Sequence, residues 1–286
     1  MSAVVAMLPG GRLHLQHGPI DAIVQAWGDA GDVSAAYAQV AQAFPAVLPG
    51  LCAELPLLRT ALPSPMPRGE IARRMHAACA PFASGFITPM AAVAGAVADH
   101  LLTTLLHDRT LARALVNDGG DIAIHLSAGQ SFRCGIVADL AAPGLNAIAT
   151  IGAQDGIGGI ATSGRRCKGK GGRSFSGGIA DAVTVLAASA AAADAAATMI
   201  ANAVDLPGHA GITRRPASAI DPDSDLGDLP VTWDVGPLTD AEIDAALEAG
   251  ARVARDCAAR GLATAAILHL GGRRAIVGTP SFAIAA

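Results

Sequence analysis

The sequence is poor in charged and aromatic residues. Charged residues make up 15% of the 286-residue chain, and Phe, Trp and Tyr together make up 3%. With a hydrophobic share of 52%, this composition is typical of a folded chain with a core and excludes an intrinsically disordered one. Because aromatic residues are scarce, the core must consist of closely packed Ala, Val, Leu and Ile.

The chain also lacks an excess of positive charge. Its net charge is −4, whereas a protein that binds nucleic acid as its main partner needs a basic face. The five cysteines have no Cys-x-x-Cys spacing, which predicts reduced thiols and neither a disulfide framework nor a zinc site. The N-terminus lacks a basic segment before an apolar run, and the apolar run at residues 91–98 is too short to span a bilayer. We therefore expect a cytoplasmic protein without a membrane or nucleic-acid partner.

Turn-forming residues divide the chain into strands and helices that alternate without a regular strand–helix–strand series. This pattern predicts an α+β fold, with a mixed sheet flanked by helices, and disfavours a doubly wound sheet. The expected strands cover residues 4–8, 12–17, 20–27, 113–117, 122–126, 132–138, 147–151, 182–187, 264–270 and 274–277. The expected helices cover residues 69–79, 88–107, 190–204 and 239–260, with a further helical region over 33–62 that is broken near Pro45 and Pro49.

Two connections are expected to be irregular: a glycine-rich loop after residue 151 and a Pro- and Asp-rich segment over 206–237. We expect one domain over residues 1–286. It would comprise an N-terminal subregion (1–85), a motif-bearing core (86–205) and a C-terminal subregion (206–286).

The predicted helix that begins at Thr88 has an unusually small face. Thr is a favourable N-cap and Pro89 suits the first helical position. Ala91, Gly95 and Ala98 share one side of this helix. Side chains so small indicate that another stretch of backbone lies close against it.

A polar turn follows the predicted strand that ends at residue 117. Asn117 and Asp118 lead into Gly119 and Gly120, and Asp121 opens the next strand. Adjacent glycines permit positive φ angles and let a ligand approach the bare backbone. Asn and Asp in such turns either bond their own backbone or contribute to a ligand site, and the sequence leaves both interpretations open.

A basic, glycine-rich segment follows Thr162, Ser163 and Gly164. Five Lys or Arg residues stand among the nine residues 165–173 of an acidic protein. Backbone N–H groups of such a segment can form an anion-binding nest, to which Arg and Lys add charge-assisted bonds. The segment is either a polyanion site or a solvated surface loop. The phosphate loop of nucleoside triphosphatases is excluded, because Gly171 stands where Ser or Thr must bind magnesium.

Asp194 and Thr198 stand four residues apart on an otherwise apolar predicted helix, which places them on one face. A carboxylate and a hydroxyl are hard oxygen ligands suited to Mg²⁺. The alternative is that both lie on a solvated face. The aspartate-rich segment 221–228 lacks the glycine that a calcium loop requires, so we predict an ordered turn there.

In this order, the segments resemble the motifs of the ApbE family, the FAD:protein FMN transferases. That family has a D-L-G-G-I-A-K-G-Y-A-V-D helix start, a V-N-x-G-G-D turn, a T-S-G loop, a V-T-V strand and an A-D-A-x-A-T helix. The equivalents here are residues 88–99, 116–121, 162–164, 183–185 and 193–198. The resemblance covers about residues 87–204 and implies an ApbE-like fold. Residues 86–99 and 223–227 look closer still to an uncharacterised, cytoplasmic branch of this family.

The resemblance implies FAD or FMN and Mg²⁺ as cofactors, and transfer of the FMN moiety to a threonine of an acceptor protein. Mg²⁺ would be held by Asp194, Thr198 and the main-chain carbonyl of Val93. Asp181, just before the 182–187 strand, is our hypothesis for the base that activates the incoming hydroxyl. The flavin nucleotide would lie against Asn117, Gly119, Gly120, Asp121, Thr162, Ser163 and Gly164. Arg165, Arg166 and Lys168 would supply the positive charge of a family lysine that is replaced by Ala94 in this chain.

Two departures from the family pattern leave the function open. Thr88 and Ala94 stand where the family has Asp and Lys, and the family's I-D-P-x-T-G segment is replaced by the basic segment. A charged hydrogen bond contributes about 1.5–3 kcal/mol, so its loss would weaken FAD binding. The chain is therefore either a Mg²⁺-dependent flavin-nucleotide transferase or FAD-hydrolysing enzyme, or a flavin- or nucleotide-binding protein without the chemistry.

Overall fold

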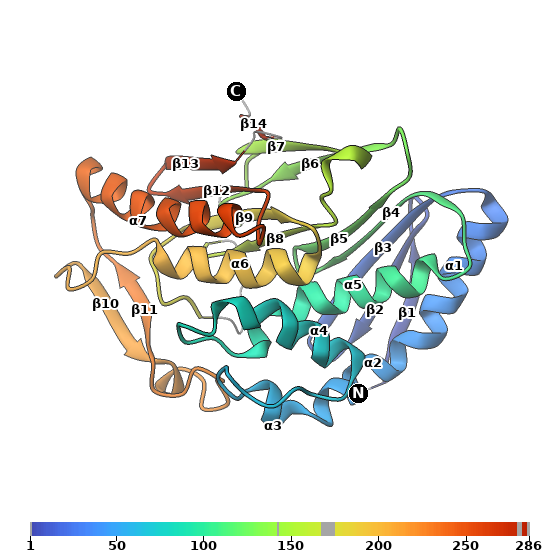
Figure 1. The fold of residues 1–286 in the computed structure, drawn as a ribbon, viewed down its shortest axis with the longest axis horizontal. Coiled ribbons are helices and arrows are strands. Elements are labelled where there is room, and N and C mark those ends of the chain that lie inside the picture. Colours follow the sequence, from blue (N-terminus) through green and yellow to red (C-terminus); the bar gives the residue numbers. More distant parts are fainter. Residues whose placement is uncertain (1, 142, 167–174, 279–281, 285–286) are drawn as a thin grey trace. The chain divides into compact units, whose positions relative to one another are not determined.

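A computed structural model describes residues 2–141, 143–166, 175–278 and 282–284. The fold class is α+β, with antiparallel strands and separate helices, as predicted (Figure 1). Contacts between residues divide the chain into two compact units. Unit 1 comprises Met1–Phe132, Ile151–Ala161 and Ala187–Ala195, and unit 2 comprises Arg133–Thr150, Thr162–Leu186 and Ala196–Ala286.

Unit 1 is built on an antiparallel sheet with the strand order β1-β2-β3-β4-β5-β8. Tight turns join β1 to β2, β2 to β3 and β4 to β5, so these strands pair with their neighbours in the chain. The strands are β1 (Val4–Leu8), β2 (Arg12–His17), β3 (Ile20–Gly28), β4 (Leu111–Asp118), β5 (Asp121–Leu126) and β8 (Gly159–Ser163), whose last two residues belong to unit 2.

Helix α5 (Val93–Leu106) packs against β4 and β5, while α1 (Ala30–Ala43) packs against β3 and α5 (Figure 1). Thr88 precedes a 3₁₀ turn rather than α5 itself, and its side chain makes no cap hydrogen bond. The remaining helical segments of this unit are η1 (Phe44–Ala46), α2 (Val47–Cys52), α3 (Leu55–Leu58), α4 (Glu70–Cys79), η2 (Ala80–Phe82), η3 (Pro89–Ala92) and η4 (Ala153–Asp155).

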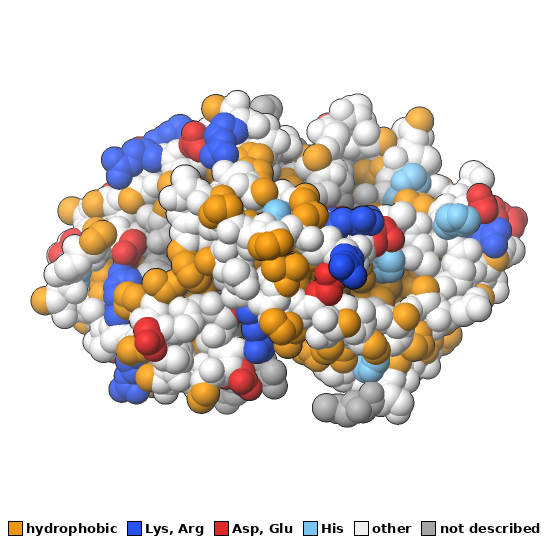
Figure 2. Space-filling view, turned by 60° about the horizontal axis from the view of Figure 1, so that its bottom comes forward, with side chains coloured by type: hydrophobic (Ala, Val, Ile, Leu, Met, Phe, Trp, Pro, Cys, Tyr) orange, Lys and Arg blue, Asp and Glu red, His pale blue; other side chains and the backbone are white. Residues whose placement is uncertain are grey.

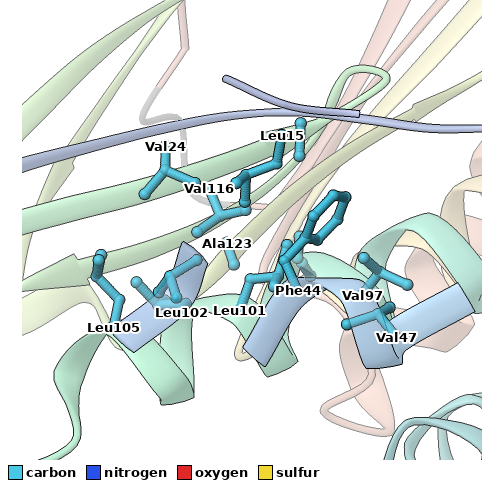
Figure 3. Close-up of a cluster of buried hydrophobic side chains, with 14 of the residues drawn as sticks. Leu15, Val24, Phe44, Val47, Val97, Leu101, Leu102, Leu105, Val116 and Ala123 are labelled. Atoms are coloured by element: carbon cyan, nitrogen blue, oxygen red, sulfur yellow. The ribbon is translucent and has the colours of Figure 1, made fainter. Parts of the chain in front are cut away.

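The core of unit 1 is mainly aliphatic, as the scarcity of aromatic residues predicts. Figure 3 shows Val24 and Val116 of the sheet beside Leu101 and Leu105 of α5, and all four side chains are fully buried. Within the described ranges, one segment, Pro89–Leu106, is long and apolar enough to cross a membrane, and 56% of it is buried inside the protein. Packing in the core accounts for its apolar side chains.

Unit 2 contains the antiparallel strands β9 (Ala182–Ala187), β12 (Ala265–Leu270) and β13 (Arg273–Gly278), in the order β9-β12-β13. Helix α7 (Asp240–Ala259) packs against β12 and β13 and begins with a capping box formed by Thr239 and Glu242. Helix α6 (Ala190–Ala203) has residues in both units. The other elements, mainly in unit 2, are β6 (Ser131–Ile136), β7 (Ala147–Gly152), β14 (Phe282–Ile284), β10 (Ile212–Pro216), η5 (Ala217–Ala219) and β11 (Pro230–Val235).

Three details differ from the sequence prediction. Strand β8 lies in the expected glycine-rich loop, because its small, buried residues show no alternation of apolar and polar side chains. The hairpin of β10 and β11 lies in the expected irregular connection, where the prolines stand only at its paired ends. Pro49 does not break the helical region, since it lies in the first turn of α2, where its missing N–H is not needed.

The segment 221–228 is an ordered turn, as predicted: Asp221 accepts hydrogen bonds from the backbone N–H groups of Asp223 and Ser224.

Candidate functional site

The turn between β4 and β5 exposes bare backbone, as its glycines predict. Asp118 pairs with Asp121, and Gly119 and Gly120 between them have φ angles of 62° and 110°. A Cβ atom added to either glycine would meet nothing within 4 Å, so open space adjoins the turn. The carbonyl oxygen of the Asn117 side chain accepts a hydrogen bond from the Gly120 N–H at 2.9 Å. Asn117 therefore orders its own turn, and its amide group keeps two N–H donors for other partners.

Asp118, in the same turn, is a buried carboxyl group that the sequence analysis did not single out. It is 5% exposed, and its Oδ1 accepts the backbone N–H of Asp21 at 3.2 Å. Burial raises the pKa of Asp118 to about 6, the hydrogen bond from Asp21 opposes the rise, and the Asp21 carboxylate adds to it. A signal was present in the sequence: Ala114, Val116 and Asp118 alternate on the buried face of β4.

The starts of helices α5 and α6 meet in unit 1. Val93 is the first residue of α5, and two residues later the Gly95 N–H donates to Asp194 Oδ2 at 3.1 Å. A Cβ on Gly95 would lie 2.3 Å from the carbonyl oxygen of Ala190, which confirms the prediction of close backbone contact at this small face. Thr198 follows Asp194 by one turn of α6, in the part assigned to unit 2.

The predicted metal ligands supply one carboxylate, one hydroxyl and one main-chain carbonyl. Among the described residues, no group of three or more His, Cys, Asp or Glu side chains could hold a metal ion. The donor chemistry of Val93, Asp194 and Thr198 nevertheless suits Mg²⁺, which prefers oxygen ligands and usually keeps several waters or phosphate oxygens in its shell.

Asp99 fixes the start of α6. Its two carboxylate oxygens accept the backbone N–H groups of Ala190 at 3.0 Å and Ala191 at 2.9 Å. Burial raises the pKa of Asp99, while these two hydrogen bonds oppose the rise. The sequence analysis had included Asp99 in a motif without a role, although an acidic residue within an apolar helix is itself a signal for a buried hydrogen-bonding function.

In unit 2, Thr162, Ser163 and Gly164 lie at the end of β8. Thr162 Oγ1 and Thr184 Oγ1 are 2.9 Å apart in a hydrogen bond, and Ser163 is buried. Gly164 has a φ of 148°, and a Cβ there would lie 2.5 Å from the carbonyl oxygen of Asp181. The two chain segments approach so closely that only glycine fits.

Arg166 and Asp181 form an ion pair in unit 2. Arg166 Nε lies 2.9 Å from Asp181 Oδ1, and its Nη1 lies 2.8 Å from Asp139 Oδ2. The hydrogen bond to Asp139 is the main cause of a raised Arg166 pKa. Asp181 Oδ2 accepts the Gly271 N–H at 2.7 Å. Both oxygens of Asp181 therefore have partners, and action as a base would require Asp181 to release one of them.

Arg165 is half-buried, and this burial lowers its pKa, while Asp181 and Asp234 oppose the change. Lys168, like residues 167–174 in general, lies outside the described residues. On the face shown in Figure 2, Lys and Arg side chains lie among apolar groups, and several of them adjoin Asp or Glu. Four cysteines lie within the described ranges, and none of them is in a disulfide bond: Cys52, Cys79, Cys134 and Cys257.

These features define an α+β protein with a glycine turn at one strand end and an Asp-bearing helix start. A family model described as "AbpE bacteria" matches residues 5–276, and the chain belongs to this ApbE-like family. A UPF0280 protein of Methanopyrus kandleri is 40% identical over 134 residues, which are 46% of this chain and 48% of that protein. The match therefore spans about half the length of this curated relative.

Among solved structures, the chain is similar to the crystal structure of the Pseudomonas stutzeri flavinyl transferase ApbE in its apo form. The two are 14% identical, with a TM-score of 0.37 and coverage of 98% of this chain and 96% of that chain. At this degree of similarity we transfer no residue role from that enzyme.

Proposed function

We propose that the protein binds a flavin nucleotide, FAD or FMN, together with Mg²⁺, and transfers or hydrolyses the nucleotide. The family match over residues 5–276 is the observation that carries this proposal. The open glycine turn supports it, because Gly119 and Gly120 leave space for a ligand beside the backbone. With FAD, transfer would join FMN to an acceptor hydroxyl and release AMP, and hydrolysis would give FMN and AMP.

Asp194, Thr198 and the Val93 carbonyl would hold Mg²⁺, which withdraws charge from a phosphoryl group when bound. A single carboxylate gives little attraction for a divalent cation that gives up its waters reluctantly. We therefore expect Mg²⁺ alone to bind weakly and the phosphates of the nucleotide to complete its shell. The Gly95 N–H orients Asp194 through their 3.1 Å hydrogen bond.

Positive charge for the phosphates would come from the segment that begins at Arg165 and Arg166 and continues through Lys168. It would replace the lysine that the family has and that is Ala94 here. Ser163 and Gly164 would support the nucleotide beside this segment. Asp181 would accept the proton of an acceptor threonine once Arg166 or Gly271 releases one of its oxygens.

A second candidate function is nucleotide binding without chemistry. The two partners of Asp181 favour it, since Arg166 and the Gly271 N–H occupy both carboxylate oxygens that would have to receive a proton. Ala94 stands where the family has a lysine, and the loss of this positive charge also favours binding without chemistry. In this case the protein would keep the flavin or another nucleotide without turning it over.

The test is to incubate the protein with FAD, Mg²⁺ and a threonine-bearing peptide, and to measure flavinylated peptide and released AMP by mass spectrometry. We expect product with the wild type and a large loss with Asp194→Asn, which keeps the shape but removes the charge. Asp108→Asn is the matched control, because this Asp108 side chain is 83% exposed and also lies in unit 1. FAD binding without product would support the second candidate, and no binding of any nucleotide would contradict both.

A further inference from the structure

Unit 1 contains a pocket whose lining includes Asp99 from the motif segment 88–99 and no residue of 116–121 or 193–198. Its volume is about 300 Å³, near the lower end for small-molecule sites. Its lining residues come from α4, α5, β5 and the segments before β8 and α6. The lining residues are Arg74, Asp99, Leu102, Thr103, Leu106, Ile124, Gly158, Ala188 and Ser189.

Part of the pocket lining is apolar. Leu102 and Leu106 lie one helical turn apart on α5, and Ile124 of β5 also lines the pocket. Gly158 contributes only backbone, since a Cβ there would lie 2.3 Å from the carbonyl oxygen of Ala188. These apolar side chains can contact a short aliphatic or aromatic group.

The lining also includes one cation, Arg74. Its Nη2 donates to Glu70 at 3.2 Å and its Nη1 donates to Thr103 Oγ1 at a long 3.4 Å. A guanidinium has five N–H donors, so these two bonds do not exhaust it. The Glu70 carboxylate is 56% exposed, and such surface ion pairs are weak and easily exchanged for another anion.

Asp99 also lines the pocket, and its carboxylate has partners within the protein, among them an electrostatic attraction to Arg74. Both of its oxygens accept backbone N–H groups, from Ala190 and Ala191 at the start of α6. The positive end of the α6 dipole lies against this carboxylate and compensates its charge. The Thr103 hydroxyl donates to the main-chain oxygen of Asp99 at 2.8 Å, so it too is committed within the protein.

We propose that this pocket binds a small amphipathic carboxylate, with its carboxylate on Arg74 and its tail against Leu102, Leu106 and Ile124. A planar guanidinium pairs with a carboxylate through two parallel hydrogen bonds, while the tail leaves water. Neither Gly95 nor Asp194 lines the pocket, although Asp99, which does, follows Gly95 by one turn of α5. The inference does not depend on the proposed flavin chemistry, because no flavin or metal ligand enters it.

Titration of the full-length protein with hexanoate, followed by NMR or calorimetry, tests this assignment. We expect saturable binding of hexanoate, weaker binding of acetate and no binding of hexylamine, which has the same tail with the opposite charge. Arg74→Met should weaken hexanoate binding about tenfold or more, as loss of a charged hydrogen bond requires. Arg73→Met is the matched control, because Arg73 is exposed on the same helix and does not line the pocket.

Ala188→Leu is a second variant, which adds volume at a lining residue of the pocket without altering its charge. It should also abolish hexanoate binding while the protein keeps its wild-type circular dichroism. The assignment is overturned if hexanoate shows no saturable binding to the wild type. It is equally overturned if Arg74→Met or Ala188→Leu, whichever folds, binds hexanoate as tightly as the wild type does.

Discussion

At the scale of single residues, Gly95 is the position least tolerant of a side chain. A Cβ there would lie 2.3 Å from the Ala190 carbonyl oxygen, a backbone atom that cannot move without shifting α6. We expect Gly95→Ala to lower the free energy of unfolding by about 3 kcal/mol, in the range of overpacked cores. Gly50→Ala is the control, since a Cβ on Gly50 of α2 meets nothing within 4 Å and alanine favours helix. Urea denaturation of both variants measures the difference, and equal stabilities would contradict the close packing.

The raised pKa of Asp118 leads us to expect that the free energy of unfolding depends on pH. Its folded-state pKa of about 6 exceeds the ordinary value of about 3.9, so the folded protein holds a proton that the unfolded chain releases. The free energy of unfolding should therefore fall as the pH rises from about 4 to about 6. This contribution is about 3 kcal/mol at most, because each pKa unit corresponds to about 1.4 kcal/mol. Titratable groups around Asp118 include Asp21, which pairs with His14, and Asp121, its partner residue on β5.

Asp118→Asn keeps an oxygen for the Asp21 N–H and removes the titration. Denaturation curves between pH 4 and 7.5 should show a smaller decline for this variant than for the wild type. Identical slopes for the two proteins would show that Asp118 titrates with an ordinary pKa.

At the scale of elements, the start of α6 depends on Asp99 of α5. Asp99 satisfies two backbone N–H groups that would otherwise lack partners at the end of a helix. We expect Asp99→Ala to cost about 2 kcal/mol, the upper range for loss of a helix cap, and to speed amide hydrogen exchange at residues 190–193. Glu70→Ala at the start of α4 serves as the control, because its side chain is exposed and pairs with the Arg74 side chain, while no side chain caps the start of α4. Unchanged exchange at the start of α6 would contradict this role.

The elements also show what the sequence could predict. Turn-forming residues on either side of β2 and β3 predicted those strands, and each strand buries alternate residues. The small face of α5 correctly predicted a close backbone neighbour. Strand β8 escaped prediction because it is buried on both sides, which removes the alternating pattern.

The candidate site was less predictable than the fold. The glycine turn follows from local residue types, and its open backbone could be expected from Gly119 and Gly120. The capping by Asp99 and the bridging of Asp139 and Asp181 by Arg166 join residues far apart in the chain. Such pairings depend on tertiary structure, and no periodicity in the sequence encodes them.

At the scale of the whole molecule, a chain with net charge −4 concentrates five cations in residues 165–173. If this segment binds phosphates, replacing Arg165, Arg166 and Lys168 together by alanine should weaken FAD binding far more than riboflavin binding. Added salt should weaken FAD binding to the wild type as well, because it screens exposed charges. Fluorescence titrations with both ligands measure this. Unchanged FAD affinity in the triple variant would show that the segment is a solvated surface loop.

The most direct test of the account is calorimetric titration of the wild-type protein with FAD, with and without Mg²⁺. The account predicts saturable FAD binding that Mg²⁺ tightens, and loss of this Mg²⁺ effect in Asp194→Asn but not in Asp108→Asn. Absence of FAD and FMN binding under both conditions would contradict it.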